Sequence, residues 1–141
     1  ILLIIGNGYD SKEGKLLQEQ ACDKIYFLGL KKNVGDYLKN SDAFALSSLN
    51  EAMPITLIEA LACGCIPLST PVSGSVDIIQ NGKNGFLSKD FSVDSYITML
   101  KDFFKNHENI DKKELEVYFE NNLSMKKCAE KYYEFFKKCL K

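Results

Sequence analysis

The fold of this chain is decided by residues 51–64, EAMPITLIEALACG. Pro54 favours the start of a helix, because the first helical turn leaves its amides unpaired and proline has no amide hydrogen to lose. Gly64 is typical of a residue that ends one. The pattern therefore predicts a helix from Pro54 to about Cys63. Its side chains are almost all apolar, so we expect it to be buried against a sheet, although it contains Glu59.

Short apolar runs and helical patterns alternate on both sides of this segment. Because these strands are apolar throughout, the alternation predicts an α/β fold: a Rossmann-like parallel sheet with helices on both faces. The expected strands are ILLII (1–5), KIYFLG (24–29), AFALSS (43–48), CIPLST (65–70) and GFLS (85–88). The other expected helices cover residues 11–21, 34–40 and about 76–80.

The last third of the chain has a helical pattern throughout. We expect residues 1–141 to form a single domain whose part from 92 to 141 is all-helical. Ser124 is placed to begin the final helix, which carries a wide apolar and aromatic side. That side could pack on the sheet of this chain or on a further domain, and the sequence leaves both open.

Composition narrows the class of protein. The 141 residues carry 18 basic and 19 acidic side chains, for a net charge of −1, which argues against a nucleic-acid binder. The spacing of the five cysteines fits neither a disulfide framework nor a zinc site, so we expect free thiols, no metal and a cytoplasmic location. The chain begins at Ile1 without a methionine, and we expect it to be part of a longer protein.

Ligands of open parallel sheets bind at the carboxyl ends of the strands. The loops at those ends are 6–10, 29–33, 47–53 and 70–75, and all four are rich in small or polar residues. Gly6 and Gly8 resemble half of a dinucleotide-binding fingerprint. The third glycine of that fingerprint would fall at Ser11, so the fingerprint fails.

The helix that begins at Pro54 is the best candidate for an anion site. Its first turn leaves the amides of Ile55 and Thr56 unpaired, and the helix dipole favours negative charge there. Thr56 and Glu59 are three residues apart and share one face of the helix. A pair of ligand hydroxyl groups is one suitable partner for Glu59. The alternatives are a solvent-exposed edge or an ion pair with a lysine.

Glu51 precedes the same helix. Its plain role would be a favourable charge near a helix N-terminus, worth about 0.3–1 kcal/mol. Its functional role would be to accept hydrogen bonds from sugar hydroxyls. Direct contact with a phosphate is excluded by repulsion between like charges.

In order and spacing these segments resemble the C-terminal, nucleotide-sugar-binding domain of retaining GT-B glycosyltransferases of family 4, the former group 1. The most specific part is SDAFALSSLNEAMPITLIEALACGCIPLST (41–70), which carries the family's E-x7-E pattern and an A-C-G-x-P-like end. ILLIIGNG resembles the family's strand ending in G-x-G, KIYFLG its V-x-F-L-G strand, and PVSGSVDIIQNGKNGFL its glycine-containing loop and turn.

The resemblance implies a set of site residues. Glu51 would be catalytic, near the donor sugar and its phosphate, and Glu59 would hold the ribose hydroxyls. The other implied donor-binding residues are Ala52, Met53, Pro54 and Ile55 beside sugar and pyrophosphate, Thr56 and Leu57 at the diphosphate, Leu28, Gly29 and Leu30 beside the base, and the loop glycines Gly6 and Gly74.

This sequence also departs from the family pattern. Ala52 stands where the family often has glycine, Pro54 removes one amide donor, and Ser73-Gly74 replaces a pair of glycines. The family's basic pair lies upstream of ILLII, as do a strand central to the sheet and the N-terminal acceptor domain. We therefore expect this piece alone to be inactive. We expect the resulting gap beside the ILLII strand to be closed by a rearranged sheet or by self-association with a strand of another copy.

The resemblance implies transfer of a sugar from a nucleoside diphosphate sugar, with retention and without a cofactor, to a glycan or lipid-linked acceptor in cell-surface polysaccharide synthesis. The whole enzyme would be a hexosyltransferase, cytoplasmic and associated with the inner face of the membrane. Two other hypotheses remain at this stage: a dinucleotide-binding oxidoreductase domain, and a non-enzymatic interaction module that uses the aromatic final helix.

Overall fold

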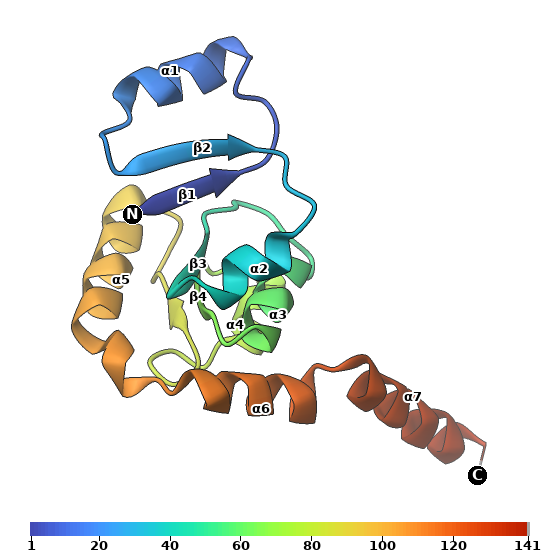
Figure 1. The fold of residues 1–141 in the computed structure, drawn as a ribbon. Coiled ribbons are helices and arrows are strands. Elements are labelled where there is room, and N and C mark those ends of the chain that lie inside the picture. The colour runs from blue at the N-terminus through green and yellow to red at the C-terminus, as the bar shows by residue number, and fades with distance from the viewer. Residues whose placement is uncertain (141) are drawn as a thin grey trace. The chain divides into compact units, whose positions relative to one another are not determined.

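A computed structural model describes residues 1–140, and every pairing between its strands is parallel. Helices connect the strands, as Figure 1 shows, so the predicted α/β class with a parallel sheet and flanking helices is confirmed. The chain divides into two compact units, Ile1–Val34 and Gly35–Lys141.

The first unit is a strand–helix–strand segment made of β1 (Leu2–Ile5), α1 (Lys12–Gln20) and β2 (Ile25–Gly29). Helix α1 begins at Ser11, whose hydroxyl accepts a hydrogen bond from the Gly14 amide at 3.0 Å. Strands β1 and β2 pair with Leu2 opposite Ile25. This is the local structure that the alternation of apolar and helical patterns predicts.

Strand β1 is less buried than its apolar sequence suggests. It pairs with β2 on one side, and among residues 1–140 no other strand pairs with it. Leu2 is 46% and Leu3 40% exposed. The expected break beside this strand is therefore present. The expected rearrangement is wrong for the described residues, because the strand order within each sheet stays β1-β2 and β3-β4-β5. Pairing with a strand of another copy stays a prediction.

The second unit is built around a three-stranded sheet with β4 at its centre. Strand β4 (Ile66–Ser69) lies between β3 (Ala43–Leu46) and β5 (Phe86–Leu87), and all four of its residues are buried. The helices of this part of the chain are α2 (Val34–Lys39), α3 (Ile55–Ala62), α4 (Ser73–Ile78), α5 (Val93–Asn106), α6 (Lys112–Asn122) and α7 (Met125–Cys139), with a 3₁₀ turn at His107–Asn109 between α5 and α6.

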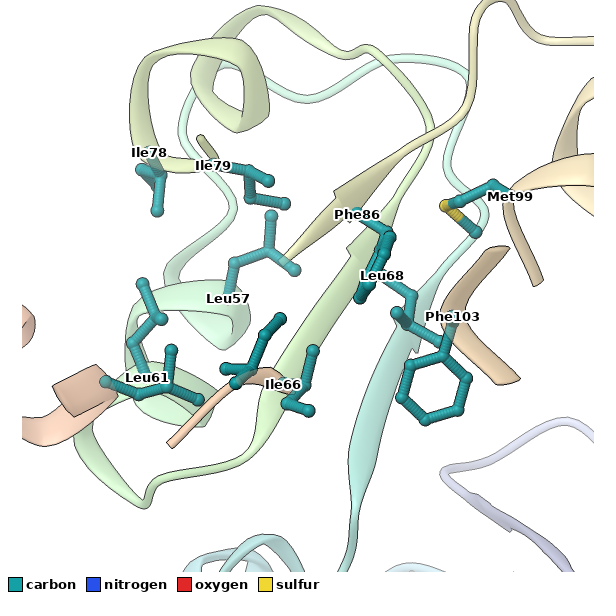
Figure 2. Close-up of a cluster of buried hydrophobic side chains, with 11 residues drawn as sticks. Leu57, Leu61, Ile66, Leu68, Ile78, Ile79, Phe86, Met99 and Phe103 are labelled. Atoms are coloured by element: carbon teal, nitrogen blue, oxygen red, sulfur yellow. The ribbon is translucent and has the colours of Figure 1, made fainter. Parts of the chain in front are cut away.

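Helix α3 supplies the centre of the hydrophobic core. Figure 2 shows Leu57 and Leu61 near Ile66 of β4 and Ile78 of α4, whereas the side chains of α5 lie beyond Leu68 and Phe86. Neither leucine is exposed to solvent. Burying a leucine side chain stabilises the fold by about 1.5–3 kcal/mol. The apolar pattern of residues 54–63 therefore fixes α3 on the sheet, and the position of α3 in turn fixes the loop that precedes it.

Two helices begin elsewhere than expected. Helix α3 begins at Ile55, and Pro54 is its N-cap residue with extended backbone angles (φ −76°, ψ 94°). Helix α4 begins at Ser73, three residues before the expected residue 76, and Val72 is its N-cap residue. Helix α3 is also not buried all round: Ile55 is 64% exposed. The helix is two-faced, with one face in the core and one in solvent.

The final helix, α7, begins after Ser124, whose hydroxyl accepts a hydrogen bond from the Lys127 amide at 3.3 Å. None of its residues is buried, and Phe135 and Phe136 are both exposed. Packing of this helix on the sheet of the same chain is thus wrong for the described residues, and packing on a further domain stays a prediction. Among residues 1–140, no helix has the length and apolar character needed to cross a membrane.

The cysteines differ in solvent exposure, and their reactivity can therefore test whether the core is packed as described. Cys65 is fully buried, and burial raises the pKa of its thiol to about 12, whereas Cys22, Cys128 and Cys139 are exposed. Because the thiolate is the reactive form, we expect iodoacetamide at about pH 8–9 to modify the three exposed thiols readily and Cys65 only after unfolding. Peptide mass spectrometry measures this. Equal labelling rates for Cys65 and Cys128 in the native protein would contradict the core described here.

Candidate functional site

The N-terminus of α3 leaves amides available. The amide of Leu57 donates to the carbonyl oxygen of Pro54 at 3.0 Å, so it is already paired. The amides of Ile55 and Thr56 come before the first helical hydrogen bonds and have no acceptor within the helix. With the helix dipole, these two amides make this end of α3 suited to bind an anion such as a phosphate group.

The solvent-facing side of α3 contains three of the predicted site residues, Ile55, Thr56 and Glu59. The Glu59 carboxylate has no hydrogen bond or ion pair within residues 1–140, and its exposure explains why the helix tolerates it. Leu57 lies on the opposite side, with its side chain in the core and its amide paired. It therefore has no group to offer a ligand, and we assign it to the core.

The loop between β3 and α3 positions Glu51. The hydroxyl of Ser48 donates a hydrogen bond to Oε1 of Glu51 at 3.0 Å, which holds the half-buried carboxylate at the start of the loop. Ala52 and Met53 follow and are exposed. Among the described residues only glycines have positive φ angles, so Ala52 occupies its position without strain. The loop in this conformation does not require the glycine that the family often has there.

Gly74 lies under this loop. A Cβ atom built on Gly74 would come within 2.6 Å of the Ala52 carbonyl oxygen and 2.8 Å of both Met53 Cα and Pro54 Cδ. The predicted site residues 52–54 are therefore in close contact with Gly74. The contact leaves no room for a side chain at position 74, so this residue has to be a glycine. Pro54 itself is buried, so its contribution to a ligand site is to shape the loop.

The first unit contains the remaining predicted residues. The Gly6 amide donates to the Gly29 carbonyl oxygen at 3.1 Å, which brings the ends of β1 and β2 together. Gly29 has a φ of +68°, a conformation that favours glycine, and Leu30 after it is 69% exposed while Leu28 is half-buried. The predicted residues thus form one group in each unit: Gly6 and Leu28–Leu30 in the first, and residues 51–59 with Gly74 in the second.

Sequence reasoning missed two residues that support Glu51. Ser48 contacts the carboxylate directly, and Thr70 donates from Oγ1 to the Ser48 carbonyl oxygen at 2.5 Å. Both belong to loops that follow parallel strands, and this position was the signal that could have marked them as site residues. Their pairing could not be predicted, because 22 residues separate them in the chain.

Comparison with known proteins gives the family. The profile of the family described as "Glycosyl transferases group 1" matches residues 1–138. N-acetyl-alpha-D-glucosaminyl L-malate synthase of Bacillus anthracis is 34% identical over 108 residues, 74% of this chain and 28% of the relative. UDP-Gal:alpha-D-GlcNAc-diphosphoundecaprenol alpha-1,3-galactosyltransferase of Escherichia coli is 29% identical over 103 residues, 71% of this chain and 27% of the relative. The chain thus spans little more than a quarter of these proteins.

Solved structures support the same fold. The lipopolysaccharide outer core galactosyltransferase WaaB, in its apo form, superposes with a TM-score of 0.81 at 22% identity, over 97% of this chain and 40% of that chain. Anabaena Alr3699/HepE in complex with UDP and glucose gives a TM-score of 0.72 at 17% identity, over 96% of this chain and 40% of that one. These two structures show the fold, which agrees with the predicted GT-B architecture. The match of the family profile to residues 1–138 decides against the dinucleotide-binding oxidoreductase, and the chain belongs to the group 1 glycosyltransferases.

Proposed function

We propose that the solvent-facing side of α3, with the loop before it, binds a nucleoside diphosphate sugar and that the whole protein transfers the sugar to a glycan or lipid-linked acceptor with retention of configuration. The observation that carries this is the placement of Glu59. Its unpaired, exposed carboxylate lies on the same helix as the two unpaired amides of Ile55 and Thr56. An anion-binding end and a hydroxyl-binding carboxylate on one short helix suit the diphosphate and ribose of one nucleotide.

The names of similar proteins support this substrate class. The Escherichia coli relative is named for UDP-Gal and a diphosphoundecaprenol-linked acceptor, and HepE was solved with UDP and glucose. In this chain, Glu59 would accept hydrogen bonds from the two ribose hydroxyls, because an ionised carboxylate accepts such bonds strongly. The amides at the start of α3 would donate hydrogen bonds to the diphosphate leaving group and stabilise the negative charge that it gains as the bond to the sugar breaks.

Glu51 would act on the sugar itself. Its second carboxylate oxygen has no partner among the described residues, and Ser48 fixes the first. A carboxylate in this position accepts hydrogen bonds from the sugar and stabilises the positive charge that develops at the anomeric carbon when the diphosphate departs. It stays off the phosphates, which repel it.

Several further properties of the whole protein belong to the same proposal. The domain described here binds the donor and requires an N-terminal acceptor domain for activity, since it spans only about 27–28% of the two relatives named above. The enzyme is a hexosyltransferase without a cofactor or metal, and it works in cell-surface polysaccharide synthesis in the cytoplasm, at the inner face of the membrane. A lipid-linked acceptor, as in the name of the Escherichia coli relative, supports this location.

The ribose role of Glu59 is tested by titrating UDP and GDP. Replacing Glu59 by alanine in the full-length protein removes hydrogen bonds to a charged group, worth about 1.5–3 kcal/mol. We expect the affinity for the preferred nucleotide to fall at least about tenfold. Isothermal titration calorimetry measures it. Glu134→Ala removes another exposed carboxylate, from α7, and should bind like the wild type. Unchanged nucleotide affinity in Glu59→Ala would refute the ribose contact.

A further inference from the structure

We propose that Thr70 is a positioning residue that sets the orientation of Glu51 through Ser48; the inference rests on the proposed function in assigning Glu51 a role in transfer. Thr70 follows β4, and Glu51 follows β3, so the two residues belong to neighbouring strand ends. The juxtaposition that carries the inference is a series of hydrogen bonds that runs from the buried residues Ser69, Thr70 and Ser75 through Ser48 to the Glu51 carboxylate.

The first link is the Thr70 side chain. Thr70 is only 3% exposed, and its hydroxyl donates to the Ser48 carbonyl oxygen at 2.5 Å. Its amide also donates to the Leu46 carbonyl oxygen at 3.1 Å, which continues the β3–β4 pairing by one residue. Thr70 therefore holds the chain at the end of β3 at two points, Leu46 and Ser48.

Thr70 is itself held rigidly. Its carbonyl oxygen accepts hydrogen bonds from the hydroxyls of Ser69 and Ser75, both at 2.8 Å, and neither serine is exposed. Ser75 also donates to the carbonyl oxygen of Val72 at 2.8 Å. Buried hydroxyls that are fully bonded leave little freedom, because breaking them inside the protein is costly. Thr70 is thus a fixed point in the fold.

The last link reaches the carboxylate. Ser48, held by Thr70 through its backbone, donates from its side chain to Oε1 of Glu51 at 3.0 Å. Gly74 supports the same loop from below through its close approach to Ala52 and Met53. Segment 69–75 therefore contacts the loop between β3 and α3 at two places. Thr70 holds the part of the loop that contains Ser48 and Glu51, and Gly74 contacts the part that contains Ala52 and Met53. Loss of the Thr70 hydroxyl frees the part that contains Ser48 and Glu51 while Gly74 keeps the rest in place.

The test uses the full-length protein with Thr70→Val, which keeps the shape of the side chain and removes the hydroxyl. We expect kcat for sugar transfer to fall about tenfold or more, since small displacements of a catalytic group are costly. The affinity for UDP should stay within about twofold, because Glu59 is untouched. Thr70→Ser restores the hydroxyl and should restore kcat. Thr98→Val makes the same chemical change on α5, where the hydroxyl bonds only to its own helix at Asp94, and should leave kcat at the wild-type value.

A double variant decides whether Thr70 acts through Glu51. If it does, Thr70→Val added to Glu51→Gln causes no further loss of kcat. Fully multiplicative losses, or a wild-type kcat in Thr70→Val, would overturn the inference. Backbone NMR order parameters, measured without substrate, are expected to fall over residues 48–53 in Thr70→Val and not in Thr70→Ser. If the wild-type protein transfers no sugar, the proposed function fails, and the order parameters still decide the structural link: unchanged values in Thr70→Val refute it.

Discussion

Replacing Glu51 by glutamine is expected to lower the turnover number of the full-length protein at least about a hundredfold, with little change in its affinity for UDP. Glutamine has the same shape but no charge. It can still accept the hydrogen bond from Ser48, so the loop should keep its conformation. What it loses is the negative charge that favours positive charge at the anomeric carbon as the diphosphate leaves. Replacing Glu51 by glutamine should therefore lower kcat.

Steady-state kinetics with the nucleotide sugar and calorimetry with UDP separate these quantities. Glu134→Gln, on the exposed side of α7, is the matched control and should match the wild type in both. A Glu51→Gln protein with wild-type turnover would remove Glu51 from the catalytic step. A loss of UDP affinity as large as that of Glu59→Ala would instead place Glu51 against the nucleotide.

Replacing Gly74 by alanine is expected to reduce the free energy of unfolding by about 1–3 kcal/mol and to weaken UDP binding as well. The added Cβ would meet backbone atoms of Ala52 and Met53 at 2.6–2.8 Å, and backbone cannot move aside as a flexible side chain could. The loop must shift, and with it both Glu51 and the start of α3. Stability and nucleotide affinity should therefore fall together.

Gly35 provides the control for this substitution. It lies in α2, and a Cβ there would meet no atom within 4 Å. Gly35→Ala should be neutral or slightly stabilising, because alanine favours helix by up to about 1 kcal/mol. Urea unfolding compares the three proteins. If Gly74→Ala were as stable as Gly35→Ala and bound UDP normally, the close contact between Gly74 of α4 and the loop between β3 and α3 would be wrong.

The sequence predicted the parts of the fold that local signals determine. Apolar runs bounded by turn residues gave the strands, and the pattern of residues 54–63 gave α3 and its buried leucines. The start of α3 differs by one residue from the prediction. Proline is typical of the first helical position, but Pro54 has extended backbone angles and is the N-cap residue, and Ile55 is the first helical residue.

Features that depend on distant segments could not be predicted. The exposure of Leu2 and Leu3, which point to opposite faces of the sheet, depends on what covers those faces, and an apolar strand sequence does not specify that. The solvent-facing position of Glu59 depends on which side of α3 meets the sheet. The link from Thr70 to Ser48 joins two strand ends that only the parallel pairing of β3 and β4 brings together.

The exposed side of α3 is expected to hold the nucleotide, with Glu59 on the ribose. A crystal structure of the full-length protein with UDP or GDP, whichever binds more tightly in the titration, tests this most directly. We expect both ribose hydroxyls within hydrogen-bonding distance of the Glu59 carboxylate and the diphosphate at the amides of Ile55 and Thr56. A nucleotide bound away from α3, with Glu59 still in solvent, would contradict this assignment.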